Sequence, residues 1–341
     1  MKVLVTGHRG YIGAVLVPLF LEAGHEVVGL DSDLYAGCDF GPAPVEVPSL
    51  TMDLRDVEAR HCQGFDAVVH LAALSNDPLG NLNPELTYDI NLHASVRLAA
   101  AAKAAGVPRF LFSSSCSLYG AGGDDFLDEN AAFNPVTPYG ESKIRVEQGL
   151  AKLADSEFSP TYLRNATAYG VSPRLRADLV VNNLVGYALT TGEVLIKSDG
   201  TPWRPLVHVE DISRAFLAVL EAPRDVVHGQ AFNVGRNQEN YRIRQVAEMV
   251  AEVVPGSRVT FAPGASPDTR NYRVDFTKIA TKLAGFRPHW TVRRGIEELA
   301  AAYRRHGLTK EEFLSPRYYR IQTVQGLQAK GRLDTSLRRT G

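Results

Sequence analysis

The sequence predicts an α/β protein with a doubly wound parallel sheet and a smaller, interleaved C-terminal domain. Short β-rich runs alternate with helix-length amphipathic stretches through the first half of the chain. A Gly-rich turn joins the first run to the first helix, and the segments of the second half are shorter and richer in loop residues. Such alternation is typical of parallel βαβ units, in which each helix returns the chain to the same end of the sheet.

The elements follow in order from the first residues. The helical stretches cover residues 12–23 and 85–105, and the β-rich runs around them read KVLVTG, EVVGLD, DAVVHLAAL and RFLFSSS. Gly24 and Gly106 stand just past these helical stretches and Pro138 stands just before another. Helices commonly end and begin at such residues, so the punctuation agrees with the hydrophobic pattern.

The domain organisation changes after the run TYLRNATAYG, although helical patterns persist at residues 211–220 and 244–254. We predict a dinucleotide-binding domain over 1–170, to which later segments return, and a substrate domain over 171–315. A basic, aromatic C-terminal arm over 316–341 has no clear periodicity. The arm either packs on the body or on a partner subunit, or it is a partly ordered tail.

Composition limits the partners of the protein. The 341 residues are 45% hydrophobic and carry a formal net charge of -1, which is no basic field for nucleic acid or anionic lipid. We therefore expect a small-molecule substrate, no nucleic acid and no membrane. The start MKVLVTG reads as a strand rather than a signal sequence, which predicts a cytoplasmic protein. Cys38, Cys62 and Cys116 lack CxxC spacing, so neither a disulfide framework nor a metal site is predicted.

The stretch VTGHRGYIGA predicts a phosphate-binding loop between a strand and a helix. Its glycines stand three residues apart, at Gly7, Gly10 and Gly13. Without side chains, the turn can bring backbone N–H groups and the positive end of the helix dipole against a phosphate. Asp31 ends the following strand, where a carboxylate can accept the ribose hydroxyls of a dinucleotide. The strand, the helix and this carboxylate together predict a dinucleotide site.

The same carboxylate favours NAD over NADP, because it repels the additional 2′-phosphate. His8 and Arg9 in the loop are the features that favour NADP.

Two later strand ends add predicted cofactor contacts. Asp53 and Leu54 in MDLRD can edge and cover an adenine ring, or Asp53 is only a helix cap. In HLAAL the small side chains allow close approach by a cofactor or pack on a helix, and the predicted contacts there are Leu71, Ala72 and Ala73.

The chemistry is predicted from PYGESK, in which Tyr139 and Lys143 are four residues apart at the start of a helix. This spacing places both side chains on one face, where the ammonium stabilises the phenolate and lowers the pKa of the tyrosine. Tyr139 is therefore a candidate general base. The run SSSCSLYG places serine hydroxyls at a strand end, where one can bond the oxygen that loses its proton. Alone, such a Tyr-x-x-x-Lys pair is usually a surface pair.

In this order, TGHRGYIG, HLAAL, SSSCSLYG, PYGESK and RPLVHVEDI resemble the extended short-chain dehydrogenase/reductase family of nucleotide-sugar epimerases and dehydratases over residues 1–300. The resemblance implies a Rossmann-type domain that holds NAD and a C-terminal domain that grips a nucleotide-diphospho sugar. It assigns catalysis to Ser115, Tyr139 and Lys143, with Lys143 also on the nicotinamide ribose. The further cofactor contacts are Tyr11, Ile12, Asn91 and Ala166. A homodimer through helix 85–105 and the Tyr139 helix is also implied.

The resemblance extends to the substrate side. VVNNLV resembles the segment over the substrate phosphates, which gives Asn183 and Leu184, and TPWRPLVHV offers Arg204 as the partner of a diphosphate. SPDTRNYRVD places Asp268 and Arg270 near the ribose or the phosphates. At two further substrate positions the chain departs from its relatives. Ser75 stands where galactose epimerases have a lysine, and Thr167 replaces an asparagine of family epimerases. A sugar other than the UDP-galactose pair is therefore expected.

The residues after Ser115 bear on the reaction. Family dehydratases carry an Asp-Glu pair there, whereas this chain has Cys116 and Ser117, which argues against elimination. Cys116 either shuttles a proton or is a small buried residue. The predicted reaction is epimerisation at C4 through a transient 4-keto sugar, with a hydride lent to NAD and returned. The alternatives are an NAD(P)H-dependent 4-keto reductase, a dehydratase and a non-catalytic dinucleotide sensor. Retention of Tyr139 and Lys143 favours an enzyme.

Overall fold

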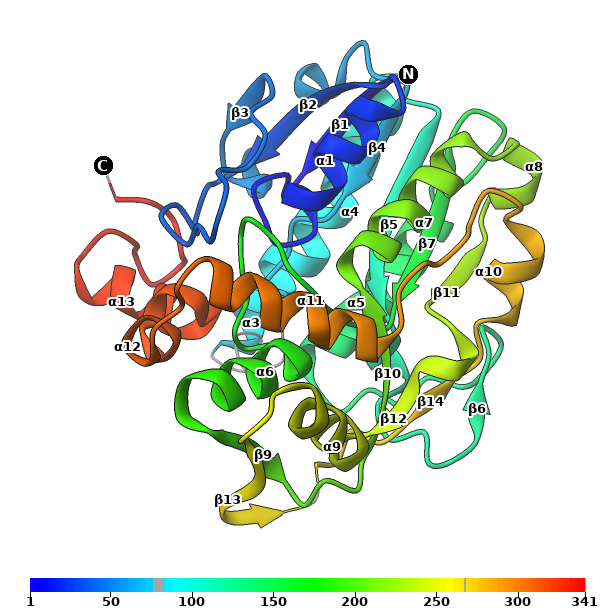
Figure 1. Cartoon of the computed structure of the whole chain (residues 1–341). Helices are drawn as coiled ribbons and strands as arrows, with labels where there is room; N and C mark the ends of the chain where they lie inside the picture. Colours follow the sequence, from blue (N-terminus) through cyan, green and yellow to red (C-terminus); the bar gives the residue numbers. More distant parts are fainter. Residues whose placement is uncertain (76–82, 267, 341) are drawn as a thin grey trace.

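The computed structural model describes residues 1–75, 83–266 and 268–340. Its centre is a parallel sheet of seven strands in the order β11-β7-β5-β4-β1-β2-β3 (Figure 1). The strands are β1 (Lys2–Thr6), β2 (Glu26–Asp31), β3 (Ser49–Thr51), β4 (Ala67–His70), β5 (Arg109–Ser115), β7 (Ser159–Asn165) and β11 (Ala231–Val234). The order reverses between β1 and β4, so the predicted doubly wound parallel sheet is confirmed. A crevice at the carboxyl ends of the strands is where such sheets bind ligands.

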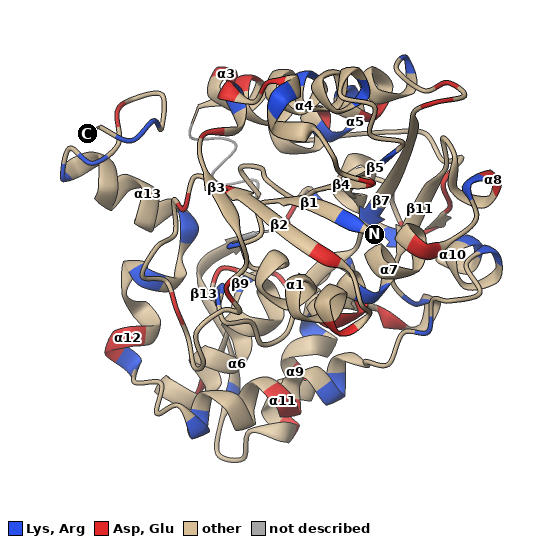
Figure 2. Cartoon of the chain, turned by 90° about the horizontal axis from the view of Figure 1, so that it is seen from above, with Lys and Arg blue, Asp and Glu red and all other residues tan. Residues whose placement is uncertain are grey.

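Helices cover both faces of the sheet (Figures 1 and 2). The helices α1 (Gly13–Glu22) and α7 (Val209–Glu221) lie on one face, and α4 (Ala94–Ala104) and α5 (Pro138–Ala151) lie on the other. Within β1, Val3 and Val5 pack with Phe20 of α1, whereas Leu4 packs with Leu98 of α4. Because both faces are buried, the strand is a continuous apolar run rather than an alternating one.

The predicted helix over 85–105 is divided into three pieces. It begins as α3 (Pro84–Thr87), which Asn83 caps by accepting the N–H of Leu86. It continues as the π-helical segment η3 (Tyr88–His93) and ends as α4. Asn91 in η3 accepts the N–H of Leu74 at 2.8 Å and donates to the Leu74 carbonyl at 3.1 Å. The wider turn therefore carries the residue that fixes the chain after β4.

The second half of the chain contributes to both parts of the molecule. Strand β11 belongs to the sheet just described and helix α7 covers it, while eight further elements build a second core that includes Val185, Ile196, Val246 and Ile296. Its elements are β8 (Thr167–Tyr169), α6 (Val180–Thr191), β9 (Glu193–Ser198), β10 (Trp203–His208), β12 (Asn240–Arg242), α9 (Ile243–Val253), β13 (Arg258–Ser266) and α11 (Val292–Arg305). Strand β10 lies between β8 and β12, and β9 pairs with β13.

Short elements complete the chain. They are the 3₁₀ turns η1 (Leu54–Asp56), η2 (Ala59–Cys62), η4 (Cys116–Tyr119) and η5 (Asn237–Glu239), the strands β6 (Phe126–Leu127) and β14 (Arg273–Val274), and the helices α8 (Arg224–Val227) and α10 (Thr277–Lys282). Strands β6 and β14 pair with each other in parallel. Within the described ranges, no helix is both long enough and apolar enough to cross a membrane.

The C-terminal arm packs on the body of its own chain. After α12 (Lys310–Leu314) it forms η6 (Pro316–Tyr318) and α13 (Arg320–Ala329), followed by a bridge between Leu333 and Arg339. Val324 and Leu333 join Leu74 in an apolar cluster separate from the two large cores. Beyond α13, the Arg338 guanidinium pairs with Asp56 at 2.7 Å. Of the alternatives for the arm, the structure therefore shows an ordered segment on the body.

Candidate active site

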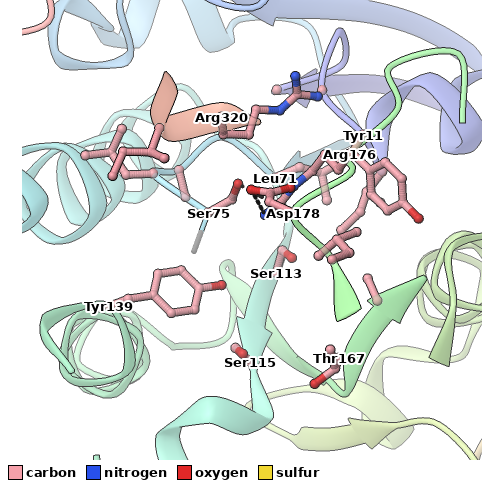
Figure 3. Close-up of a pocket in the computed structure, with 18 of the residues that line it drawn as sticks. Tyr11, Leu71, Ser75, Ser113, Ser115, Tyr139, Thr167, Arg176, Asp178 and Arg320 are labelled. Atoms are coloured by element: carbon pink, nitrogen blue, oxygen red, sulfur yellow. Dashed lines mark hydrogen bonds and ion pairs between the residues drawn. The ribbon is translucent and has the colours of Figure 1, made fainter. Parts of the chain in front are cut away.

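A cavity of about 950 Å³ lies at the carboxyl ends of the sheet strands, between the sheet and the second core. Every predicted cofactor residue except Asn91, and every predicted substrate residue, lines it. Among the predicted catalytic residues, Ser115, Tyr139 and Lys143 line it and Cys116 does not. Segments distant in sequence therefore meet at one site. Figure 3 shows Tyr139, Ser115 and Thr167 at one end of it and Arg176, Asp178 and Arg320 at the other.

The glycine loop is tight enough to require glycine. Gly7 has φ +73, and a Cβ on it would lie 2.7 Å from the backbone nitrogen of Ala72 at the end of β4. A Cβ on Gly13 would collide with the carbonyls of Gly7 and His8. The ends of β1 and β4 are thus in close contact, and the loop has bare backbone at the start of α1. This cradle fits the diphosphate of a dinucleotide.

The charges around Asp31 favour NAD over NADP. Asp31 accepts the backbone N–H of Arg9 at 3.0 Å and that of Asp33 at 2.8 Å, and burial raises its pKa. The Arg9 guanidinium is paired with Asp33 at 3.3 Å and with Glu46 at 3.6 Å. The His8 ring is buried against β2, and burial lowers its pKa. Neither basic residue of the loop is therefore an uncompensated cation for a 2′-phosphate.

Helix α5 brings the tyrosine and the lysine together. Thr137 caps the helix by accepting the N–H of Gly140 at 3.2 Å, so its first turns carry Tyr139 and Lys143. The Lys143 Nζ lies 5.5 Å from the centroid of the Tyr139 ring and donates to the Ser113 carbonyl at 2.7 Å. Burial lowers the pKa of Lys143 to about 7. An ammonium in this position stabilises negative charge on the phenol oxygen.

The three serines at the end of β5 point alternately to the two faces of the sheet. Ser114 is buried and donates to Glu147 at 2.5 Å. Ser113 and Ser115 alternate with it, and Figure 3 shows both on the side of the cavity that Tyr139 faces. The Ser113 hydroxyl is already engaged by Asn165 at 3.0 Å. Ser115 ends the strand and lines the cavity; its Oγ accepts the backbone N–H of Ser117 at 3.2 Å and lies 2.6 Å from the Ser117 Oγ.

Two residues predicted for the site lie outside the cavity lining. The Cys116 side chain is fully buried in the core and its thiol donates to the Arg164 carbonyl at 3.1 Å. Burial raises its pKa well above the usual value, which disfavours the thiolate. Asn91 bonds the backbone of Leu74 instead of facing the cavity. Cys116 directly follows β5, and Asn91 lies beside the segment that follows β4. The side chains of both residues turn toward the protein interior.

Charged side chains meet at the substrate end. The Arg204 guanidinium donates to Asp268 at 2.8 Å and also to the carbonyls of Trp203 and Arg270. Arg270 donates to the same carboxylate at 2.6 Å. Two guanidinium groups therefore share the Asp268 carboxylate at this part of the cavity wall. Such a group suits an anionic diphosphate.

The segment before α6 forms the facing wall. Leu184 lines the cavity, and the Asn183 amide donates to the Ala177 carbonyl at 2.7 Å and to the Tyr319 hydroxyl at 3.3 Å. The Asn183 side chain therefore links this segment to the C-terminal arm.

Sequence reasoning missed several lining residues. Arg176 pairs with Asp178 at 2.9 Å and donates to the Ser75 hydroxyl at 3.2 Å (Figure 3). The other missed residues of note are Tyr35, Lys197 and Arg320. The closely spaced charges of the run RLRADL and the basic, aromatic character of the arm are the only signals in the sequence that point to them.

The fold and the glycine loop define a Rossmann-type dinucleotide-binding protein. Comparison with known proteins gives the family within this class. The model of the NAD dependent epimerase/dehydratase family matches residues 3–235, and the chain belongs to this family. It is an extended short-chain dehydrogenase/reductase, and NAD is its cofactor.

Two curated relatives are similar over most of the chain. The UDP-glucose 4-epimerase of Mycolicibacterium smegmatis is 30% identical over 322 residues, which cover 89% of this chain and 99% of that protein. The UDP-glucose 4-epimerase of Corynebacterium glutamicum is 29% identical over 322 residues, with 89% and 95% covered. The solved structure of MoeE5 in complex with UDP-glucuronic acid and NAD is 28% identical with a TM-score of 0.78, and the match covers 89% of this chain and 99% of that chain.

Proposed function

We propose that the protein is an NAD-dependent epimerase that inverts C4 of a nucleotide-diphospho sugar through a transient 4-keto intermediate. The observation that carries the proposal is the position of Lys143, whose ammonium lies beside the Tyr139 ring in the same cavity as the glycine loop. The epimerase names of the relatives at 29 and 30% identity support the same class of reaction.

In this proposal the residues of α5 and β5 handle one proton. Tyr139 takes the proton of the sugar 4-hydroxyl, and the Lys143 ammonium stabilises the phenolate that forms. The Ser113 carbonyl holds Lys143 in place, and the Ser115 hydroxyl bonds the sugar oxygen as it becomes a ketone. Bound NAD supplies the chemistry of accepting a hydride from C4 and returning it. The 4-keto sugar then reorients so that its other face receives the hydride. Tyr139 returns its proton to the oxygen on the inverted carbon.

The environment of Ser115 argues against elimination, although the family includes dehydratases. Removal of water needs an acid and a base beside the reacting carbons. The two residues after Ser115 are Cys116 and Ser117. The buried Cys116 thiol donates a hydrogen bond to the Arg164 carbonyl, and the Ser117 hydroxyl lies 2.6 Å from that of Ser115. Neither is a carboxylate.

The substrate end supports a nucleotide-diphospho sugar. We assign the diphosphate to Arg204, with Arg270 and Asp268 beside it, and to the start of α6 around Asn183 and Leu184. Near the sugar, Ser75 accepts a hydrogen bond from Arg176, and Thr167 lies across the cavity from Tyr139 (Figure 3). These differences from galactose epimerases favour a sugar other than the UDP-galactose pair.

We also propose a cytoplasmic homodimer in which α4 and α5 of two chains form a four-helix interface. The two helices pack closely within the chain, where a Cβ on Gly149 would lie 2.6 Å from Val96. The three cysteines are buried and unbridged, which fits a reducing compartment.

The test is a panel of nucleotide-diphospho hexoses, hexuronates and their 4-keto forms, incubated in D₂O with no added cofactor. The expected product is a stereoisomer of unchanged mass without deuterium, followed by mass spectrometry and NMR. We expect Tyr139→Phe to lower kcat by about 10²- to 10⁴-fold while NAD stays bound. Loss of water would identify a dehydratase, and turnover only after addition of NAD(P)H would identify a reductase. No reaction with the 4-keto forms or the sugars under either condition would favour the non-catalytic sensor.

A further inference from the structure

The C-terminal arm brings a buried arginine into the wall of the cavity. Arg320 is the first residue of α13 and is only 1% exposed. Its guanidinium carbon lies 4.2 Å from the centroid of the Tyr35 ring, and its Nη2 donates to the Arg174 carbonyl at 3.0 Å. Figure 3 shows the side chain at the end of the cavity where Tyr11 and Arg176 lie, away from Tyr139.

Two polar atoms at this place lack partners. Within the described residues, neither the Nη1 of Arg320 nor the hydroxyl of Tyr35 makes a hydrogen bond, although both atoms are buried. Both residues line the cavity. Buried polar groups are nearly always hydrogen-bonded, and an unmatched one is costly, so two of them on residues that line one cavity favour a ligand that satisfies both.

The charge of Arg320 indicates which kind of ligand. Guanidinium stays protonated in proteins, so this side chain is a buried cation. The nearby carboxylate of Asp178 is bound by Arg176 through both of its oxygens, at 2.9 and 3.1 Å. In the described chain, no carboxylate forms an ion pair with Arg320. A buried cation without an anion is unfavourable, and a phosphate oxygen is a suitable partner for the fork of the guanidinium.

We propose that Arg320 and Tyr35 bind the diphosphate of NAD, so that the C-terminal arm forms part of the cofactor site. Tyr35 lies on the loop after β2, four residues beyond Asp31, and therefore on the cofactor side of the cavity. The cations assigned to the nucleotide sugar come from β10 and from the segment before β14. The proposal rests on NAD binding and not on the reaction proposed above.

The arm is held in a way that fits this role. Arg317 donates to the carbonyls of Gly37 at 3.1 Å and Asp39 at 2.6 Å, on the same loop that carries Tyr35. Arg338 pairs with Asp56, and Asp53 and Leu54 just before it line the cavity. The arm therefore contacts two segments of the predicted adenosine site, the loop after β2 and the turn at Asp56. Arg320 lies in the arm between the residues that make these two contacts.

The test compares NAD affinity with the stability of the empty protein. Arg320→Met and Tyr35→Phe are stripped of nucleotide, and Kd values for NAD and for UDP or GDP are measured by calorimetry, with Tm in the presence and absence of NAD. The control is Arg332→Met, an exposed arginine of the same arm. Arg320→Met is expected to weaken NAD by about 10-fold or more, since it removes a hydrogen bond to a charged group, and Tyr35→Phe by a few fold.

The outcomes separate the two roles of the arginine. The proposal predicts that the Tm of the empty Arg320→Met protein is not lower than that of the wild type, because removal of a buried cation without an anionic partner offsets the lost contacts with Arg174 and Tyr35, while the NAD-induced rise in Tm shrinks. Unchanged NAD affinity with a lowered Tm in the empty protein would overturn it in favour of a structural arginine. Weaker UDP or GDP with unchanged NAD would assign the diphosphate to the sugar nucleotide instead. If Arg320→Met does not fold, unchanged NAD affinity in Tyr35→Phe is the overturning result.

Discussion

At the residue scale, the most informative side chain is Lys143. It is 4% exposed, and the sheet strand β5 lies against it through the Ser113 carbonyl and the Phe112 ring, 4.7 Å from Nζ. Loss of hydration lowers its pKa to about 7, and Glu147 opposes this shift only in part. Folding thus places the Lys143 amine where its hydration is lost, beside the Tyr139 ring.

This burial predicts a pH dependence of stability. In the unfolded chain the pKa of lysine is near its ordinary value of about 10.4, so between pH 7 and about 10.4 the unfolded state binds more protons than the folded state. The free energy of unfolding of the nucleotide-free protein should therefore rise with pH across this window. Lys143→Met should lose this rise and be the more stable protein at pH 7. The measurement is urea unfolding at several pH values.

Lys152→Met is the control, since that lysine is exposed at the end of the same helix. It should keep the wild-type dependence on pH. Equal slopes for wild type and Lys143→Met would show that Lys143 is not destabilised by burial.

Sequence patterns predict those site residues whose placement depends only on nearby residues of the same strand end or helix. The glycine loop and Asp31 stand at the ends of strands, and Tyr139 and Lys143 share a helix face, so spacing alone brings each set together. Cys116 also follows a strand end, but spacing does not give the direction of its side chain, which the η4 turn sends into the core. Arg176 and Arg320 reach the cavity only through tertiary contacts, for which the sequence has no periodic signal.

At the element scale, the sheet and its covering helices follow from hydrophobic pattern, while irregular elements do not. A helix over 85–105 is predicted correctly in extent, but its π-helical turn depends on the bonds between Asn91 and Leu74 across the chain. The C-terminal arm has no periodicity because α13 packs against three separated segments, the loop after β2, Leu74 after β4 and the α3–η3 region.

The proposed homodimer can be tested on the face formed by α4 and α5. Small side chains at Ala100 and Ala104 are exposed on α4, one turn apart. If this face pairs with a second chain, the double variant Ala100→Glu, Ala104→Glu should be monomeric because it buries like charges at the interface. Light scattering after size exclusion measures the mass. Ala23→Glu, on the opposite side of the sheet after α1, should remain dimeric. A monomeric wild-type protein would contradict the homodimer.

At the scale of the whole molecule, the parallel sheet gathers one site from the entire chain. Lining residues extend from Gly7 in the first loop to Leu337 in the arm, and the strand order reverses where the cavity lies. Figure 2 shows Lys and Arg mixed with Asp and Glu over the helices, consistent with a net charge of -1. The proposed function therefore assigns recognition of an anionic substrate to Arg204 and its neighbours rather than to the charge of the whole surface.

The central claim is that the chain inverts C4 by lending and recovering one hydride. The most direct measurement uses the nucleotide sugar that the panel identifies, deuterated at C4, in ordinary water with no added cofactor, and follows the label by NMR until the stereoisomers reach equilibrium. The account predicts that deuterium remains on C4 of both stereoisomers, because the hydrogen never exchanges with water. Loss of the deuterium from C4, or inversion at another carbon with uptake of a solvent proton, would contradict it.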